Sequence, residues 1–250
     1  MFSPITISMT AFYFGIYRHR IQKGFLSEGG RNCIMTLDLL FDLDGTLVDT
    51  VYVTSDVLNS MLKERGSHRR ILPEEARPLV TLGGEAMIAN LFGDDCLDPI
   101  ADVTEYRRLC AERVTEESSL FPGVRQGIEK LADLGMKMAV CSNKPQNLVE
   151  KIMTDLRFDR YMTAMVGAKP DLPRKPNPKL LEIALQEMNG QLQTCWFIGD
   201  GETDQEASAT LGIPFIFAAY GYGTPIPELP VTVSCPNFTS ITSFLEKKVR

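Results

Sequence analysis

The spacing of apolar residues changes along this 250-residue chain. Residues 37–41 (LDLLF) form a short, mostly apolar run that leads into a polar, glycine-containing segment at 42–46, a pattern typical of a buried strand followed by a turn. Over residues 52–117, apolar positions instead recur with helical spacing, with breaks at glycine and proline residues. The pattern therefore predicts one strand followed by an all-helical insert.

After residue 123 the pattern becomes a strict alternation of helix and strand. We expect helices over 124–134, 146–156, 179–188 and 205–211, and strands over 136–141, 161–166, 195–198 and 214–218. Such alternation predicts an α/β fold, a doubly wound parallel sheet with a Rossmann-like arrangement. We expect a catalytic core over 35–50 and 118–250, a small all-helical cap domain over 51–117 inserted after the first strand, and an atypical extension over 1–34.

The composition is that of an ordinary globular protein, with 44% apolar and 23% charged residues. A net charge of -6 disfavours nucleic acid as a partner, and no apolar run reaches the roughly 20 residues that span a bilayer, so we expect no membrane partner. The six cysteines are scattered and form no CxxC pair, which favours a reducing, cytoplasmic location. The chain is expected to be a monomer or a homodimer.

The first 34 residues differ from the rest because they contain four basic residues and only Glu28 as an acid. Such a segment is typical of an organelle presequence. An over-long start is the interpretation we favour, with Met35 as the working first residue. We therefore expect a chain that begins at Met35 to fold and to keep its activity.

Polar residues that are suited to catalysis or ligand binding follow several of the predicted strands. They are Asp42, Asp44, Gly45 and Thr46 after the first strand, Ser142 and Asn143 after the second, Lys175 further on, and Asp200 and Asp204 after the strand at 195–198. Ligands bind at the carboxyl ends of strands in such sheets. Converging carboxylates need a cation between them, and their hard oxygen atoms select Mg²⁺. A magnesium site is the consequence.

The substrate that fits such a site is a small phosphate ester, because Mg²⁺ is commonly shared between a few carboxylates and phosphate oxygens. With only two histidines in the chain, a carboxylate is the natural nucleophile, and it would form an aspartyl phosphate that water then hydrolyses. Lys175 would neutralise charge on the transferring group, and Ser142 would donate a hydrogen bond to a phosphoryl oxygen.

Four segments resemble the motifs of the haloacid dehalogenase superfamily, in their order and spacing. They are FDLDGTLVDT at 41–50, CSNK at 141–144, RKPNP at 174–178 and IGDGETD at 198–204. FPGV at 121–124, LPRKPNP at 172–178 and AYGYG at 219–223 are, more narrowly, similar to segments of phosphoglycolate phosphatases. The resemblance extends from about residue 37 to the C-terminus and implies a magnesium-dependent phosphatase, with 2-phosphoglycolate as the first-choice substrate.

The resemblance also implies a role for each residue. Asp42 is expected to be the nucleophile, and Asp44 the general acid that protonates the leaving group and then the base that activates water. Mg²⁺ would be held by the Asp42 carboxylate, the Asp44 backbone carbonyl and Asp200, with Asp204 in support. Thr46, Ser142, Asn143 and Lys175 are expected to bind substrate. One departure is Gly201, which stands where the superfamily usually has a hydroxyl residue.

Simpler interpretations remain open for several of these residues. Ser142 and Asn143 precede a predicted helix and are suitable as helix caps, as is Asp204, and we expect Asp49 to cap the first helix of the insert. The substrate could instead be a sugar phosphate, pyrophosphate or a nucleotide, or the enzyme a β-phosphoglucomutase-like phosphomutase. A non-catalytic binding module is a further alternative, against which the complete set of polar residues argues.

Overall fold

The computed structural model describes residues 36–249. The predicted extension over residues 1–34, and with it the proposed start at Met35, lies outside the described residues. Among the described residues, no helix combines the length and apolar character that crossing a bilayer requires.

A parallel sheet of six strands forms the centre of the protein, in the order β3-β2-β1-β4-β5-β6. The strands are β1 (Asp38–Phe41), β2 (Lys137–Pro145), β3 (Ala164–Ala168), β4 (Cys195–Gly199), β5 (Phe215–Ala218) and β6 (Val233–Cys235). In the middle of the sheet, Phe41 of β1 lies opposite Val140 of β2 and Ile198 of β4. The residues that follow β1, β2 and β4 therefore emerge side by side at one edge.

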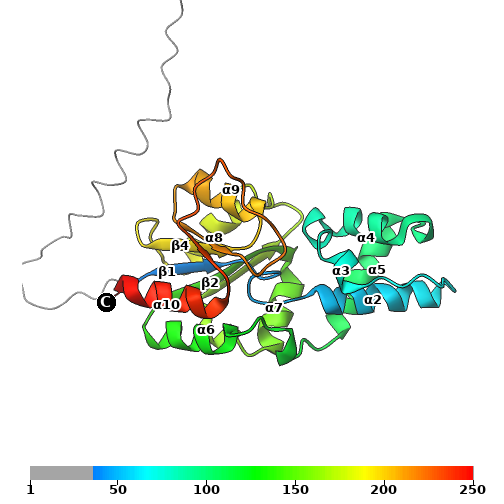
Figure 1. Cartoon of the computed structure of the whole chain (residues 1–250), viewed down its shortest axis with the longest axis horizontal. Helices are drawn as coiled ribbons and strands as arrows, with labels where there is room; N and C mark the ends of the chain where they lie inside the picture. The colour runs from blue at the N-terminus through cyan, green and yellow to red at the C-terminus, as the bar shows by residue number, and fades with distance from the viewer. Residues whose placement is uncertain (1–35, 250) are drawn as a thin grey trace, which may run out of the picture. The chain divides into compact units, whose positions relative to one another are not determined.

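Helices cover both faces of the sheet. On one face, α6 (Val124–Asp133), α7 (Gln146–Asp155) and α10 (Phe238–Val249) share a buried apolar cluster with the strands. On the other face, α8 (Lys179–Glu187) and α9 (Glu202–Leu211) form a second cluster with the sheet. Figure 1 shows α8 and α9 above the sheet and α6 and α10 below it. The predicted doubly wound α/β fold is therefore confirmed.

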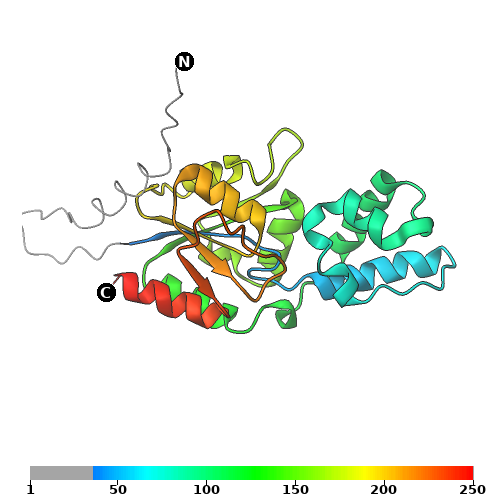
Figure 2. The same ribbon diagram turned by 45° about the horizontal axis from the view of Figure 1, so that its top comes forward.

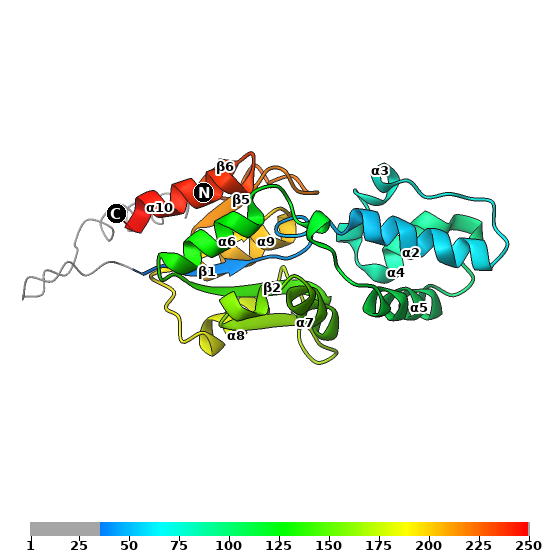
Figure 3. The ribbon, with the colours of Figure 1, turned by 90° about the horizontal axis from the view of Figure 1, so that it is seen from below.

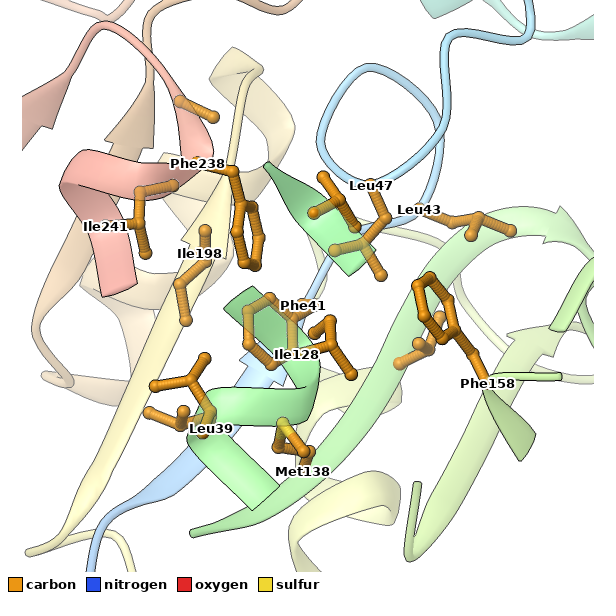
Figure 4. Packing of buried hydrophobic residues seen from close by; sticks show 14 of the residues in the cluster. Leu39, Phe41, Leu43, Leu47, Ile128, Met138, Phe158, Ile198, Phe238 and Ile241 are labelled. Atoms are coloured by element: carbon orange, nitrogen blue, oxygen red, sulfur yellow. The ribbon is translucent and has the colours of Figure 1, made fainter. Parts of the chain in front are cut away.

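Alternate residues of β1 face the two apolar clusters. Leu39 and Phe41 belong to the first, and Leu40 belongs to the second. The ring of Phe41 packs against that of Phe238 from α10, with 6.1 Å between ring centroids (Figure 4). Burial of both faces makes β1 a fixed support, so Asp42, which follows it directly, has a well-defined position.

The predicted helical insert follows β1. It consists of α2 (Val51–Glu64), α3 (Pro73–Ala76), α4 (Gly84–Phe92) and α5 (Pro99–Glu112), which surround a buried apolar cluster of their own. Figures 2 and 3 show these helices beside the end of the sheet. The chain enters and leaves the insert through two adjacent segments, joined by hydrogen bonds from Asp49 N to Ser119 O (2.7 Å) and from Phe121 N to Leu47 O (3.2 Å).

Several element boundaries differ from the predicted ones. β3 begins at Ala164, not at 161, because Asp159–Tyr161 form a 3-10 turn. α9 begins at Glu202, three residues before the predicted start at 205, with Gly201 as its N-cap residue. β6 and α10 were not predicted as elements, although α10 supplies Phe238, Ile241 and Leu245 to the core.

Candidate active site

Three carboxylates meet at the carboxyl edge of the sheet. Asp42 follows β1, Asp200 follows β4, and Asp204 lies in the first turn of α9. All three are buried, and each offers an oxygen atom within 4.8 Å of those of the other two. The adjacent, in-register ends of β1 and β4 therefore place Asp42 and Asp200 together, as the sequence predicts.

Lys175 bridges two of these carboxylates. Its Nζ donates hydrogen bonds to Asp42 Oδ1 (2.6 Å), Asp204 Oδ1 (2.7 Å) and the backbone oxygen of Cys141 (2.9 Å). Burial opposes the charge of this ammonium group, but Asp204 and Asp42 outweigh burial, so the pKa of Lys175 is raised above its usual value. Lys175 is thus a permanently charged group in contact with the predicted nucleophile.

The loop that carries Lys175 is held by Asn143. The Asn143 side chain accepts a hydrogen bond from Lys175 N (2.8 Å) and donates one to Lys175 O (3.0 Å). Ser142 is buried beside it, and its hydroxyl accepts a hydrogen bond from Lys144 N at 3.2 Å. The register of β2 against β3 shifts between Cys141 and Pro145, and such irregularities often redirect side chains next to active sites. Substrate contacts by Ser142 and Asn143 stay predictions.

Asp200 is fixed from two sides. Its Oδ1 accepts a hydrogen bond from the Thr46 hydroxyl at 3.1 Å, and its Oδ2 accepts one from Tyr222 N at 2.6 Å. Thr46 is fully buried, so the structure gives its hydroxyl a role in holding Asp200, and a direct contact with substrate stays a prediction. Gly45, at φ +84°, packs so closely that a Cβ there would lie 2.2 Å from Asp200 Oδ2.

The carboxylates of Asp42, Asp200 and Asp204 together carry more negative charge than the one ammonium group of Lys175 balances. Burial raises the pKa of Asp42 well above its usual value despite the opposing effect of Lys175, and Asp204 and Asp200 raise it further. Burial, followed by Asp204, also raises the pKa of Asp200 to about 7. Three buried carboxylates around one ammonium group thus favour an additional cation. The oxygen-only donor set fits Mg²⁺.

Asp44 lies apart from the three-carboxylate cluster and is more accessible, with 25% of its side chain exposed. Its Oδ1 accepts a hydrogen bond from the Thr50 hydroxyl at 2.7 Å, and both of its oxygens lie 3.0 Å from Lys144 Nζ. Asp44 is therefore separated from Asp42 in environment as well as in position. A partly accessible carboxylate is suited to exchanging protons with substrate and water.

Comparison with known proteins agrees with this geometry. The family profile described as haloacid dehalogenase-like hydrolase matches residues 39–218. The chain belongs to this family. It is 31% identical over 185 residues to the phosphoglycolate phosphatase of Xanthomonas campestris, covering 74% of this chain and 83% of that protein. It is 28% identical to the phosphoglycolate phosphatase of Rhodobacter capsulatus, over 83% of this chain and 96% of that one.

The fold of this haloacid dehalogenase-like hydrolase is also found among solved structures. One is CbbY from Rhodobacter sphaeroides in complex with xylulose 1,5-bisphosphate, which has a TM-score of 0.64 and 23% sequence identity. The match covers 82% of this chain and 95% of that one. The likeness supports the core with its inserted helical cap.

Two groups in this hydrolase were not assigned a role from the sequence. Lys144 belongs to the CSNK segment, yet only the structure shows that its ammonium group reaches Asp44. Tyr222 belongs to the AYGYG segment, and it contributes its backbone N–H to Asp200 and its hydroxyl to Asp49 Oδ1 (2.8 Å). Both residues lie in segments that resemble motifs of the family, and that position was the signal in the sequence that pointed to a role in the site.

The expectation that Asp49 caps the first helix of the insert is wrong. Thr50 is the N-cap residue of α2, and no side chain caps that end. The Asp49 carboxylate instead accepts the hydrogen bond from Tyr222 and forms an ion pair with Arg77 of the insert at 3.3 Å. Asp204, by contrast, does act as a cap at the start of α9, because its Oδ2 accepts a hydrogen bond from Gly201 N (3.1 Å). Its Oδ1 accepts a hydrogen bond from Lys175, and its support of a metal ion stays a prediction.

Proposed function

We propose that this hydrolase is a magnesium-dependent phosphatase that cleaves a small phosphate monoester, 2-phosphoglycolate, through an aspartyl-phosphate intermediate. The observation that supports it most strongly is the placement of Asp42. This buried carboxylate contacts Lys175 at 2.6 Å and lies beside Asp200 and Asp204, while Asp44 stands nearby in a separate environment. Hydrolysis of a phosphate monoester through a covalent intermediate uses this pairing of a nucleophile with a proton-transfer group.

In the first step, an oxygen of Asp42 attacks the phosphorus atom of the ester. A bond forms between that oxygen and phosphorus, the ester P–O bond breaks, and Asp44 gives its proton to the leaving alkoxide. The Lys175 ammonium group orients Asp42 and offsets negative charge on the transferring phosphoryl group. This step produces the free alcohol and phosphorylated Asp42.

In the second step, Asp44 accepts a proton from water, and the water oxygen attacks the phosphorus atom. The bond between phosphorus and Asp42 breaks, which releases inorganic phosphate and regenerates the carboxylate. Lys144 and Thr50 hold the Asp44 side chain in one orientation through both steps. The same carboxylate thus acts first as an acid and then as a base.

The Asp42 carboxylate, the Asp44 backbone carbonyl and Asp200 would hold Mg²⁺, with Asp204 in support. The ion supplies positive charge that binds phosphoryl oxygens and balances the buried carboxylates. Asp200 is prepared for this role by the hydrogen bonds from Thr46 and Tyr222. Each of those donors fixes one carboxylate oxygen, so the orientation of the ligand is set in advance.

Two features of the fold support the division into domains. The helices over 51–117 have their own apolar cluster and join the rest through two adjacent segments. We assign 35–50 and 118–250 to the catalytic core and 51–117 to a cap domain that closes over the substrate. The five cysteines among the described residues are free thiols, which agrees with our assignment of the reaction to a reducing cytoplasm.

The choice of 2-phosphoglycolate is supported by two relatives, the phosphoglycolate phosphatases of Xanthomonas campestris and Rhodobacter capsulatus. The test is the release of inorganic phosphate from a panel of small phosphate compounds, with Mg²⁺ and with EDTA. The panel contains 2-phosphoglycolate, a sugar phosphate, a nucleoside monophosphate and pyrophosphate. We expect Mg²⁺-dependent release that is highest for 2-phosphoglycolate.

Asp42→Asn is the critical variant in this assay, and Asp133→Asn, an exposed position at the end of α6, is its matched control. We expect loss of essentially all release in the first and wild-type release in the second. Faster release from another ester would identify that ester as the preferred substrate and would leave the proposed mechanism unchanged. Absence of release from every ester, or full activity of Asp42→Asn, would refute the proposed function.

A further inference from the structure

Tyr222 lies in the loop after β5, where the insert meets the core. Its side chain packs against the buried apolar cluster of the insert and also against the one that α6, α7 and α10 share with the sheet. Its hydroxyl donates a hydrogen bond to Asp49 Oδ1 (2.8 Å), on the segment that enters the insert. Its ring is tilted against that of Phe121, on the segment that leaves the insert, with 6.3 Å between ring centroids. Tyr222 therefore contacts both connections between insert and core.

Arg77, which ends α3 of the insert, contacts the first two of these residues. Its guanidinium group lies over the Tyr222 ring, with Cζ 5.2 Å from the ring centroid, and its Nη2 donates a hydrogen bond to Asp49 Oδ2 at 3.3 Å. One oxygen of Asp49 thus binds the tyrosine hydroxyl, and the other binds the arginine. A cation over an aromatic face and a charge-assisted hydrogen bond are both attractive. The three side chains form one connected unit between the insert and the loop after β5.

The backbone of Tyr222 binds Asp200. Tyr222 N donates a hydrogen bond to Asp200 Oδ2 at 2.6 Å. The glycines on either side pack tightly against the same residue, since a Cβ on Gly221 would lie 2.3 Å from Asp200 Cβ and one on Gly223 would lie 2.6 Å from Asp200 O. Further along, the Gln205 side chain of α9 binds backbone groups of the loop. The loop is therefore packed against Asp200, and a displacement of Tyr222 moves a donor of this carboxylate.

We propose that Tyr222 is a positioning residue that couples the placement of the insert, through Arg77 and Asp49, to the orientation of Asp200. The inference rests on the proposed function and extends it, because it makes Mg²⁺ binding depend on the insert. A carboxylate whose hydrogen-bond donor is fixed keeps the orientation that a metal ligand needs, and loss of such an outer partner weakens metal binding. An insert that closes on the core would therefore tighten the metal site as it covers the substrate.

The experiment measures the Mg²⁺ affinity of Tyr222→Phe, which removes only the hydroxyl, and of Arg77→Gln, which removes the guanidinium group. Thermal unfolding at a series of Mg²⁺ concentrations gives the dissociation constant without substrate, because an ion that binds the folded state raises Tm. We expect each variant to weaken Mg²⁺ binding by about 3- to 10-fold, less than loss of the donor itself, because the backbone N–H remains. At saturating Mg²⁺, kcat for phosphate release should return to within about twofold of wild type.

Two further comparisons test whether the contacts act as one unit. Because Arg77 and Tyr222 act through the same contact, Arg77→Gln combined with Tyr222→Phe should bind Mg²⁺ no more weakly than the weaker of the single variants. Asp49→Ala removes the acceptor that both side chains share and should match this double variant. Asp49→Asn keeps an oxygen for the tyrosine hydroxyl, so it should bind Mg²⁺ more tightly than Asp49→Ala.

The matched controls remove similar contacts elsewhere in the molecule. Tyr161→Phe removes a half-buried hydroxyl that contacts the Glu129 carboxylate (3.4 Å), just before β3 at the opposite edge of the sheet. Arg65→Gln removes an ion pair with Asp102 and a position over the Phe92 ring (5.0 Å to the centroid), both within the insert. We expect Arg65→Gln to lower Tm, and both controls to keep wild-type Mg²⁺ affinity, which separates a change in stability from a change in the metal site.

Unchanged Mg²⁺ affinity in either Tyr222→Phe or Arg77→Gln would overturn the role of Tyr222, as would equal weakening in the controls. Losses that multiply in the double variant would show that the two side chains act separately and would also overturn it. Failure of the proposed function looks different, because wild type would then release no phosphate from any of the phosphate compounds, whatever the Mg²⁺ affinities of the variants. A wild type that binds no Mg²⁺ would refute both.

Discussion

Lys144 and Asp44 form an ion pair in which the ammonium nitrogen lies 3.0 Å from each carboxylate oxygen. The pair connects the end of β2 to the loop after β1, two segments 100 residues apart in the chain. Burial opposes the charge of Lys144, but Asp44 outweighs burial and raises the pKa of the lysine. Lys144 is therefore a positioning residue for the proposed acid and base.

Replacement of Lys144 by Met should lower kcat by about 10- to 100-fold, because Asp44 loses a charge-assisted contact that orients it for proton transfer. The effect should appear in kcat more than in KM. The loss in kcat/KM, which reports the phosphorylation step, should be smallest with 4-nitrophenyl phosphate, whose leaving group needs little protonation. Lys179→Met, in an exposed pair with Glu182, is the control and should keep wild-type constants. An equal loss in kcat/KM with all leaving groups would contradict a role through Asp44 as the acid.

Gly45→Ala should abolish turnover and weaken Mg²⁺ binding. Gly45 has φ +84°, and a Cβ would lie 2.2 Å from Asp200 Oδ2, so the methyl group forces the carboxylate out of place. Gly135→Ala is the control, because Gly135 has φ +75° but no atom within 4 Å of the Cβ position. That variant should lose about 1 kcal/mol of stability and keep its activity. Normal Mg²⁺ activation of Gly45→Ala would contradict the packing argument.

The metal-free protein should become less stable as the pH rises from about 4 to about 7. In the folded state, burial and then Asp204 raise the pKa of Asp200 to about 7, whereas the pKa of an Asp in the unfolded chain is about 3.9. The folded state therefore holds a proton that the unfolded state releases, and the stability which that proton provides is lost as the pH rises through the folded pKa. Thermal unfolding in EDTA measures this trend.

Mg²⁺ should reverse the loss at neutral pH, because it balances the ionised carboxylates. In Asp200→Asn, both the pH dependence in this window and the Mg²⁺-induced rise in Tm should shrink. A metal-free wild type whose Tm rises between about pH 4 and about pH 7 would show that Asp200 is not the dominant group.

Asp102→Asn should destabilise the insert. Asp102 is buried on α5 and receives hydrogen bonds from Arg65, one of them at 3.1 Å, and this contact lowers the pKa of the carboxyl group. We expect the free energy of unfolding to fall by about 1–3 kcal/mol at neutral pH. The difference should vanish in acid, as the pH falls through the lowered pKa.

Urea denaturation measures the effect, with Glu105→Gln as the control. Glu105 forms an exposed pair with Arg108, and such pairs contribute at most about 1 kcal/mol. A loss in Asp102→Asn no larger than that of the control would contradict the structural importance of the Arg65 contact.

The sequence alone was sufficient to predict the positions of the site residues that directly follow strands. Asp42 and Asp200 come after apolar runs, and the rules of parallel sheets place the ends of such runs at one edge. Asp42 and Asp200 lie close together because β1 and β4 are neighbouring parallel strands. The alternation of helix and strand predicted a parallel sheet of this type.

The contacts of Lys144 and Tyr222 could not be predicted in the same way. Each depends on how a side chain or loop is placed against a segment far away in the sequence, such as Tyr222 against Asp200 at a separation of 22 residues and Lys144 against Asp44 at 100. Local periodicity carries no information about such distances. The misplaced cap at Asp49 has the same origin, because its partners lie on the insert and on the loop after β5.

The phosphorylation of Asp42 is the most direct test of the proposed chemistry. Asp44→Asn is mixed with 4-nitrophenyl phosphate and Mg²⁺, quenched in acid and analysed by peptide mass spectrometry. The activated leaving group needs no proton from Asp44, whereas hydrolysis of the intermediate needs a base, so the phosphorylated enzyme should accumulate. We predict phosphate on the peptide that contains Asp42, and none with EDTA or when Asp42→Asn is added. Release of 4-nitrophenol without modification of Asp42 would contradict the mechanism.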